Sequence, residues 1–414
     1  MHLRSRLAYH LAAALGLVWL CASPAWSRTE TVVWNFSNSN GDGANPLSNS
    51  LISDGKGNLF GATLSGGVPN CMGGCGMVFE LSPNGSGGYN ETILHDFTGT
   101  NGDGAGPPGG LVFDPQGNLY GVTVEGGANG TGTVYELSPN SGGGWTETIL
   151  YSFGAANSGD ANLPQNGLIR DSAGNLYGTA GGGGINDGSC IGDCGTVFEL
   201  SPSAGGWTET ILHRFRGAGG RYNGDGAGPN SLTFDTLGNL YGTTYVGGNQ
   251  RLNYGTVFKV KRTKTGWVES VIHSFTVADG TNPWGNVIVD KAGRIYGTCN
   301  QAGGTAWELS RSGSAYSLRV LYSFSLVNGG PGSITMNRVG NILGATAANG
   351  SDGTATFYKL IKSGNSWTEK VVHTFTGGSD GGEPSLGPPL LDSSGNIFGL
   401  AVTGGDGVAF ELTP

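Results

Sequence analysis

Six aspartates recur at one place along this chain, each in a Gly-rich stretch between two apolar segments. They are Asp42, Asp103 and Asp225, which stand in the sequence N-G-D-G, and Asp160, Asp279 and Asp380. Carboxylate oxygens are the ligands that Ca²⁺ prefers, and a group of them could also bind a polyhydroxylated ligand. The other interpretation is that Asp beside Gly makes an Asx turn. The sequence therefore permits a Ca²⁺ site, with these six residues as its candidate ligands, and does not require one.

The histidines argue against a common class of hydrolase. Four follow residue 27, each two positions before a phenylalanine: His95, His213, His273 and His373. The same slot elsewhere holds Tyr151, Tyr322 and Trp34. Because His, Tyr and Trp all occur at this position, the shared requirement is a flat ring with a polar atom and not a general base. We therefore expect no Ser-His-Asp triad and name no catalytic residue.

One stretch departs from the regular pattern and could bind a ligand. Its parts are residues 216–230 (RGAGGRYNGDGAGPN), residues 245–254 (YVGGNQRLNY) and the next linker. They bring together Arg221, Tyr222, Arg251, Tyr254 and Trp284. Such residues can stack on a sugar or hold an acidic group, although aromatic residues in loops often serve only local packing. These five are our candidate ligand-binding residues.

The N-terminal end predicts export. A basic start, an apolar run over residues 11–20 and the small residue Ser27 are typical of a secretory signal occupying residues 1–27. Cys21 raises the alternative of a lipoprotein, although the bulky Trp19 and Leu20 before it fit that signal poorly. No later segment is long and apolar enough to be a transmembrane helix. We expect a single domain over residues 28–414, secreted to the periplasm or the extracellular space.

The cysteines fit that location. Cys71 with Cys75, and Cys190 with Cys194, share one spacing inside Gly-rich loops, which predicts two local disulfides. A lone C-x3-C is a weak signal for zinc. Cys299 has no evident partner and is expected to be a buried thiol.

Charge excludes one class of partner. The formal net charge is −9, and removal of residues 1–27, which contain two arginines and no acidic residue, changes it to −11. Such a surface repels nucleic acid. With 37% hydrophobic residues the chain can bury a sizeable core, and we expect a monomer.

A turn motif sets the architecture that must position these residues. The pattern D-x-x-G-N-[LI]-[YF]-G occurs in seven recognisable copies, whose fourth-position glycines are 57, 117, 174, 238, 293, 340 and 395. Asp caps the backbone two residues later, and Gly accepts a positive φ, so each copy predicts a hairpin turn.

Four apolar runs surround each turn in a fixed order, as in SLTFD, NLYGTT, GTVFKV and WVESVIHSF of residues 231–275. They predict an all-β, seven-bladed β-propeller with four antiparallel strands in each blade. The extra strand at residues 29–36 should pair with residues 408–412 and close the ring. The six aspartates should then surround the mouth of the channel, and Glu80, Glu136, Glu199 and Glu209 should line solvated strand ends.

The joint pattern of GNLYGTT-like turns, a GG loop, GTVFELSP and GWTETILHSF resembles the GloVer (Gloeobacter and Verrucomicrobia) extracellular repeat family over residues 29–414. Members are exported and often carry interchangeable C-terminal anchors, whereas this sequence stops at Pro414 without one. The resemblance implies the architecture and export but no established activity. The turn alone is similar, more loosely, to NHL and lactonase-type propellers.

Three functions remain in view. The favoured one is an exported, non-enzymatic propeller that recognises a carbohydrate, a peptide or a cell-surface partner on one face. The alternative is a metal-assisted lyase or lactonase that uses carboxylates at the channel mouth to hold a divalent ion. A passive structural or matrix protein is the third, and a propeller fold is compatible with all of them.

Overall fold

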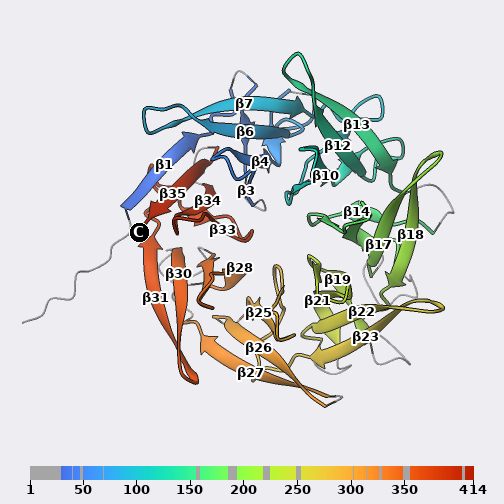
Figure 1. Ribbon diagram of the computed structural model, residues 1–414, viewed down its shortest axis with the longest axis vertical. Coiled ribbons are helices and arrows are strands. Elements are labelled where there is room, and N and C mark those ends of the chain that lie inside the picture. Colours follow the sequence, from blue (N-terminus) through green and yellow to red (C-terminus); the bar gives the residue numbers. More distant parts are fainter. Residues whose placement is uncertain are drawn as a thin grey trace, which may run out of the picture.

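Short runs of β-branched and aromatic residues, bounded by Gly and Asn, form strands throughout the described part of the chain, and none there forms a helix. The computed structural model describes residues 29–39, 41–46, 50–68, 70–154, 159–184, 194–217, 224–248, 253–301, 303–313, 315–325, 329–347, 355–402 and 406–414. In these residues seven antiparallel sheets form a ring (Figure 1), four of them with four strands and three with an additional linker strand, so the predicted seven-bladed propeller is confirmed. No helix in the described residues could span a membrane.

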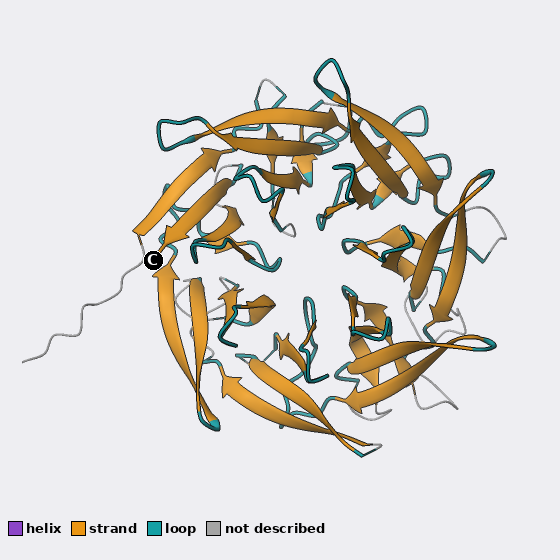
Figure 2. Ribbon diagram, in the orientation of Figure 1, coloured by secondary structure: helices purple, strands orange, loops and turns teal. Residues whose placement is uncertain are grey.

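Each blade runs outward from a short inner strand to a long outer strand (Figure 2). Blade 1 consists of β3 (Ile52–Ser53), β4 (Leu59–Thr63), β6 (Met77–Pro83) and β7 (Tyr89–Asp96). Blade 2 consists of β9 (Val112–Phe113), β10 (Leu119–Thr123), β12 (Thr133–Pro139) and β13 (Trp145–Ser152). Blade 3 consists of β15 (Ile169–Arg170), β16 (Leu176–Gly182), β17 (Thr196–Ser203) and β18 (Gly206–Arg214). Blades 4 and 5 consist of β20 (Thr233–Phe234), β21 (Leu240–Gly248), β22 (Thr256–Thr263) and β23 (Gly266–Ser274); and β24 (Ile288–Val289), β25 (Ile295–Cys299), β26 (Thr305–Ser312) and β27 (Ala315–Ser323). Blade 6 consists of β28 (Pro331–Met336), β29 (Ile342–Thr346), β30 (Thr356–Ser363) and β31 (Ser366–Thr374).

Blade 7 joins the two ends of the described chain. It contains β33 (Leu390–Leu391), β34 (Ile397–Val402) and β35 (Val408–Thr413), and its outer strand is β1 (Thr29–Asn35). β1 lies antiparallel to β35, with Thr29 opposite Thr413 and Val32 opposite Phe410. The predicted closure is therefore confirmed, and the outer edge of β35 is paired (Figure 1).

Five linkers between blades pair with the second strand of a blade or with a short strand that follows it. The pairs are β2 (Gly43–Ala44) with β5 (Ser65–Gly66), β8 (Gly104–Ala105) with β11 (Glu125–Gly126), β14 (Asn162–Pro164) with β16, β19 (Gly224–Pro229) with β21, and β32 (Glu383–Pro384) with β34. This pairing holds these five linkers against their blades.

The turn motif acts as its sequence predicts. Asp114 Oδ1 accepts hydrogen bonds from the backbone N–H groups of Gln116 (2.9 Å) and Asn118 (2.8 Å). Gly117 has a φ of 92°, which the motif glycine accepts without the cost that a side chain would add.

Aromatic pairs fill the space between neighbouring blades. The phenylalanine that follows each outer strand packs on a ring from the third strand of the next blade, with centroids 4.7 to 5.5 Å apart. The pairs are Phe36–Phe79, Phe97–Tyr135, Phe153–Phe198, Phe215–Phe258, Phe275–Trp307, Phe324–Tyr358 and Phe375–Phe410. Each pair contributes about 0.5–1.5 kcal/mol beyond its buried area. Seven repeated interfaces, and not one central core, therefore stabilise the ring.

The cysteines follow their prediction as far as the described residues reach. Cys71 and Cys75 form a disulfide, and Cys194 is also disulfide-bonded, while its expected partner Cys190 lies outside the described residues. Cys299 is a buried free thiol.

Candidate functional site

The linker aspartates are held by residues at the ends of the outer strands. Asp103 Oδ2 accepts hydrogen bonds from the backbone N–H and the hydroxyl of Thr98, both at 2.7 Å, just after β7 ends. Asp42 makes the same contacts with Ser37, and Asp380 with Thr376. These contacts support the interpretation of Asp42, Asp103 and Asp380 as turn-forming residues and place them beside the ends of outer strands, whereas the sequence prediction expected the six aspartates around the channel mouth.

Five of these aspartates also reach the ring residue near the end of the same outer strand. Tyr151 donates to Asp160 at 3.0 Å, and the Nε2 atoms of His95, His213, His273 and His373 lie 3.5, 2.9, 3.2 and 3.4 Å from Asp103, Asp225, Asp279 and Asp380. The shared slot for His and Tyr thus has a physical reason. Either ring offers a polar atom to the linker while its body packs between blades.

A glutamate of the next blade completes most of these groups. Glu147 of β13 lies beside His95 and Asp103, and Glu269 of β23 lies beside His213 and Asp225. We call these two sets the His95 junction and the His213 junction. Sequence reasoning missed both. The available signal was that the ring slot, the linker aspartate and the glutamate of W-T-E-T repeat in the same phase along the chain.

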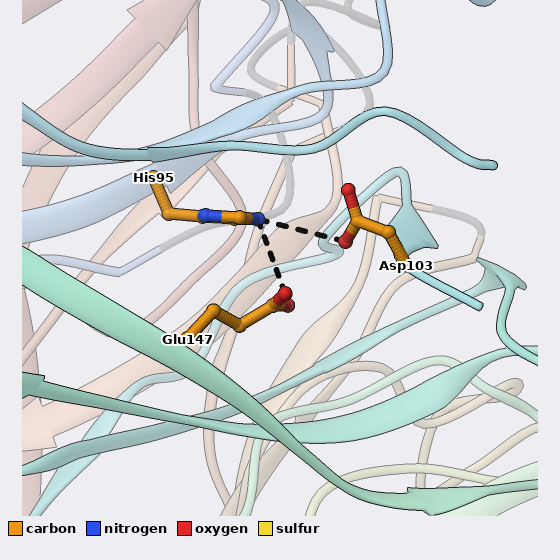
Figure 3. Close-up of side chains that lie close together, drawn as sticks. All are labelled: His95, Asp103 and Glu147. Atoms are coloured by element: carbon orange, nitrogen blue, oxygen red, sulfur yellow. Dashed lines mark ion pairs between the residues drawn. The ribbon is translucent and has the colours of Figure 1, made fainter. Parts of the chain in front are cut away.

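The His95 junction has more buried polar atoms without a hydrogen-bond partner than the His213 junction has. Figure 3 shows His95, Asp103 and Glu147 converging from β7, the linker and β13. His95 Nε2 lies 3.5 Å from Asp103 Oδ1 and 3.5 Å from Glu147 Oε2. His95 Nε2, Asp103 Oδ1 and Glu147 Oε1 are all shielded from solvent without a hydrogen-bond partner. The three residues can hold a metal ion in this arrangement.

Electrostatics at the His95 junction couples the three groups. Burial alone would lower the pKa of His95, but Asp103 and Glu147 outweigh burial and raise it. Burial raises the pKa of Glu147 to about 7, against the opposing effect of His95. The pKa of Asp103 is lowered: burial opposes ionisation, and the contacts with His95 and Thr98 overcome it. These directions describe a site that favours positive charge.

The His213 junction is held by hydrogen bonds instead. His213 Nε2 lies 2.9 Å from Asp225 Oδ2, and the backbone N–H of Arg216 donates to Asp225 Oδ1 at 2.8 Å. Both oxygens of Asp225 are therefore occupied. Burial and the negative charge of Asp225 raise the pKa of Glu269 to about 8.

The other boundaries between blades have different residues or different hydrogen bonds at these positions. Tyr322 donates to Glu369 at 2.8 Å, and the backbone N–H of Ala161 donates to Glu209 at 3.3 Å. Beside His273 and Asp279, Leu318 takes the register position that Glu147 holds in blade 2, because Leu318 pairs with Leu309 as Glu147 pairs with Leu137. We call His273, Asp279 and Leu318 the His273 junction.

The glutamates expected at solvated strand ends are partly misplaced. Glu199 is only 8% exposed and accepts a hydrogen bond from Tyr177 at 3.0 Å. Glu209 lies at a junction, where burial raises its pKa to about 9.

The predicted ligand-binding patch is described only in part. Arg221, Tyr222 and Arg251 lie outside the described residues. Tyr254 is half-buried and packs against the core of blades 4 and 5. Trp284 is 40% exposed and makes an edge contact with Tyr245, with ring centroids 5.4 Å apart. Tyr245, which the prediction did not include, is the residue that Trp284 meets.

Side-chain hydrogen bonds from Asn282 and Gln301 hold Tyr245 in place. Asn282 Nδ2 donates to the carbonyl of Tyr245 at 3.1 Å, and Gln301 Nε2 reaches the Tyr245 hydroxyl at 3.5 Å. We call Tyr245, Trp284 and Gln301 the aromatic platform. It joins the C-terminal part of β21 in blade 4 to the linker that precedes β24 and to the residues that follow β25.

A separate cavity of about 830 Å³ lies along the inner strands of blades 5, 6, 7 and 1. Its walls include Leu51, Ile288, Met336 and Leu390, and Asp392 is the one carboxylate among its described lining residues. That carboxylate caps its own turn, through hydrogen bonds from Ser394 and Asn396.

The chain matches a known family along almost its whole length. The family model of the Gloeobacter/Verrucomicrobia repeat matches residues 22–191 and 186–413, which confirms the resemblance that the motifs carry. A comparison with curated proteins finds no match.

Solved structures share the fold. One is named as a candidate 6-phosphogluconolactonase from Bacteroides uniformis, with 12% sequence identity, a TM-score of 0.50 and coverage of 81% of this chain and 92% of that one. Another, from Bacteroides fragilis and named in the same way, has 15% identity, a TM-score of 0.50 and coverage of 84% and 89%. At this identity the similarity shows a common propeller architecture.

Proposed function

The chain belongs to the Gloeobacter/Verrucomicrobia repeat family, and we propose that it is an exported, non-enzymatic propeller that binds carbohydrate through the aromatic platform. The observation that carries this proposal is the 40% exposure of Trp284 on a backing that holds its ring in place. Every other aromatic side chain in the described residues is buried or half-buried. Because the indole of Trp284 is exposed and held in place, it offers a flat apolar surface to a ligand.

The platform has the chemistry that a sugar requires. The apolar face of a pyranose can stack on the indole of Trp284, and the amide of Gln301 and the hydroxyl of Tyr245 can bond to its hydroxyl groups. Because the contact between Trp284 and Tyr245 exists before any ligand arrives, binding orders few side chains.

Export is supported by the oxidised cysteines. The Cys71–Cys75 disulfide is typical of a compartment outside the cytosol, as is the signal predicted for residues 1–27. The alternative, a metal-assisted lyase or lactonase, would need free carboxylates in the central cavity. Asp392, which lines that cavity, is already engaged by its own turn.

A glycan array with the purified protein tests the proposal, followed by calorimetric titration of each glycan that binds. Trp284→Ala should weaken binding at least tenfold, and Tyr245→Ala should weaken it by a smaller factor, because it removes the support and not the stacking surface. Leu237→Ala is the matched control, since Leu237 is 85% exposed in the turn between β20 and β21.

Two outcomes would contradict the proposal. Either no glycan binds, or Trp284→Ala binds as tightly as the wild type. Hydrolysis of lactones that depends on an added divalent ion would favour the enzymatic alternative instead.

A further inference from the structure

We propose that the His95 junction is a Zn²⁺-binding site, formed by His95, Asp103 and Glu147, that links blade 1 to blade 2. The site is distinct from the aromatic platform, and the proposal does not depend on carbohydrate binding. It also differs from the Ca²⁺ site considered from the sequence, because its ligands come from an outer strand, a linker and the next outer strand.

The spacing of the three residues fits a small tetrahedral ion. Zinc binds nitrogen and oxygen at about 2.0–2.2 Å, so two ligands of a tetrahedral zinc ion lie about 3.3–3.6 Å apart. His95 Nε2 lies 3.5 Å from Asp103 Oδ1 and 3.5 Å from Glu147 Oε2. These separations are long for hydrogen bonds and match two edges of the tetrahedron. All three ligand atoms lie within 4.8 Å of one another.

Unmet bonding capacity gives a second, independent argument. His95 Nε2 and Asp103 Oδ1 are buried and have no hydrogen-bond partner, and neither has Oε1 of Glu147, the carboxylate oxygen other than the one 3.5 Å from His95. Such atoms are costly to bury unless something bonds to them. Meanwhile Asp103 Oδ2 accepts two hydrogen bonds from Thr98, which orient the carboxylate and leave Oδ1 directed at His95.

Neighbouring junctions show that the arrangement is particular to this one. At the His213 junction both oxygens of Asp225 accept hydrogen bonds, and His213 is one of the partners, at 2.9 Å. At the junction of His373 both oxygens of Asp380 are engaged by Thr376. Among the described junctions, the His95 junction is where all three members keep an unpartnered buried atom.

The ligand set selects the class of ion. One imidazole nitrogen and two carboxylates suit a borderline transition ion such as Zn²⁺. Ca²⁺ takes six to eight oxygen ligands, which this junction does not offer. Side-chain exposures of 14% for the carboxylates and 21% for the imidazole leave a path for the ion and for a water molecule as a further ligand.

Calorimetric titration of Zn²⁺ into tag-free, chelator-treated protein tests the site. We expect saturable binding that His95→Gln reduces by one equivalent and that Glu147→Gln weakens at least tenfold. His273→Gln is the matched control, because the His273 junction has the same His–Asp pair, 3.2 Å apart, with Leu318 in place of the glutamate. It should bind Zn²⁺ like the wild type.

A thermal melt gives a readout that does not depend on heat of binding. Zn²⁺ should raise the melting temperature of the wild type and of His273→Gln but not of His95→Gln, since an ion that binds only the folded state stabilises it. The proposal is overturned if the wild type shows no saturable Zn²⁺ binding, if His95→Gln keeps every equivalent, or if Ca²⁺ displaces the bound Zn²⁺.

Discussion

The ring of Phe36 packs against that of Phe79, with centroids 5.1 Å apart. Phe36 follows β1, at the start of the described chain, and Phe79 lies in β6 of blade 1. The backbone N–H of Phe36 also donates to the carbonyl of Gly407, just before β35, at 2.9 Å. One residue therefore connects the last blade to the first, and the closure of the ring involves packing as well as strand pairing.

Replacing this phenylalanine tests the closure. Phe36 is 4% exposed, so Phe36→Ala should lower the free energy of unfolding by about 3–5 kcal/mol, the range for a buried Phe→Ala substitution. Urea unfolding measures the change. Val268→Ala, at a position 52% exposed on an outer strand, should stay within about 0.5 kcal/mol of the wild type. A Phe36→Ala protein as stable as that control would show that the closure carries little stability.

The turn glycines should be sensitive because of conformation and not because of space. Gly117 has a φ of 92°, and a Cβ there would meet no atom within 4 Å. Gly117→Ala should therefore cost about 1–2 kcal/mol through backbone strain alone. Gly142→Ala is the control, because Gly142 has equal space and no positive φ, and its unfolding free energy should change by less than about 0.5 kcal/mol. Equal losses at both positions would contradict the role assigned to φ.

The disulfide closes a small loop, so its effect should be modest. Cys71 and Cys75 are four positions apart, and loop-closure entropy predicts that replacing both by Ser lowers the free energy of unfolding by about 2 kcal/mol. Met72→Ser in the same loop is a fitting control, since Met72 is fully exposed. If the double variant unfolds at the same urea concentration as the wild type, the loop is ordered without its disulfide.

Much of the fold could be predicted from the sequence because its determinants are local. The Asp and Gly of each turn act within a few residues of each other, as Asp114 and Gly117 show. The repeat gave the number of blades, and the extra strand at residues 29–36 gave the closure.

The junctions could not be predicted, because they depend on contacts between blades. Asp103 lies in the linker between blades 1 and 2 and Glu147 in the outer strand of blade 2, so their proximity depends on how the blades are arranged around the ring. A register shift adds to the difficulty: Val78 pairs with His95 and Phe79 with Ile93, which leaves Leu94 as an extra residue in the outer strand. The position of such a bulge is not visible in a pattern of apolar residues.

The junction between blades 2 and 3 should make stability depend on pH. Burial and the neighbouring Asp160 together raise the pKa of Glu209 to about 9, although the backbone N–H of Ala161 and the guanidinium of Arg214 act in the opposite direction. In the unfolded chain this carboxyl returns to its ordinary value of 4.5. The folded protein therefore binds more protons between these limits, and its stability must fall as pH rises through them.

Glu209→Gln removes this titration and keeps the shape of the side chain. The variant should lose less stability than the wild type between pH 5 and pH 9, because its amide is neutral at every pH. In the folded wild type, the buried carboxyl of Glu209 must either keep its proton or ionise as the pH rises, and either course costs stability relative to the unfolded chain. Urea unfolding at about pH 5, 7 and 9 measures both profiles. Glu125→Gln, in an exposed position of β11, should leave the profile of the wild type unchanged. Parallel profiles for the wild type and Glu209→Gln would show that Glu209 does not retain its proton at the junction.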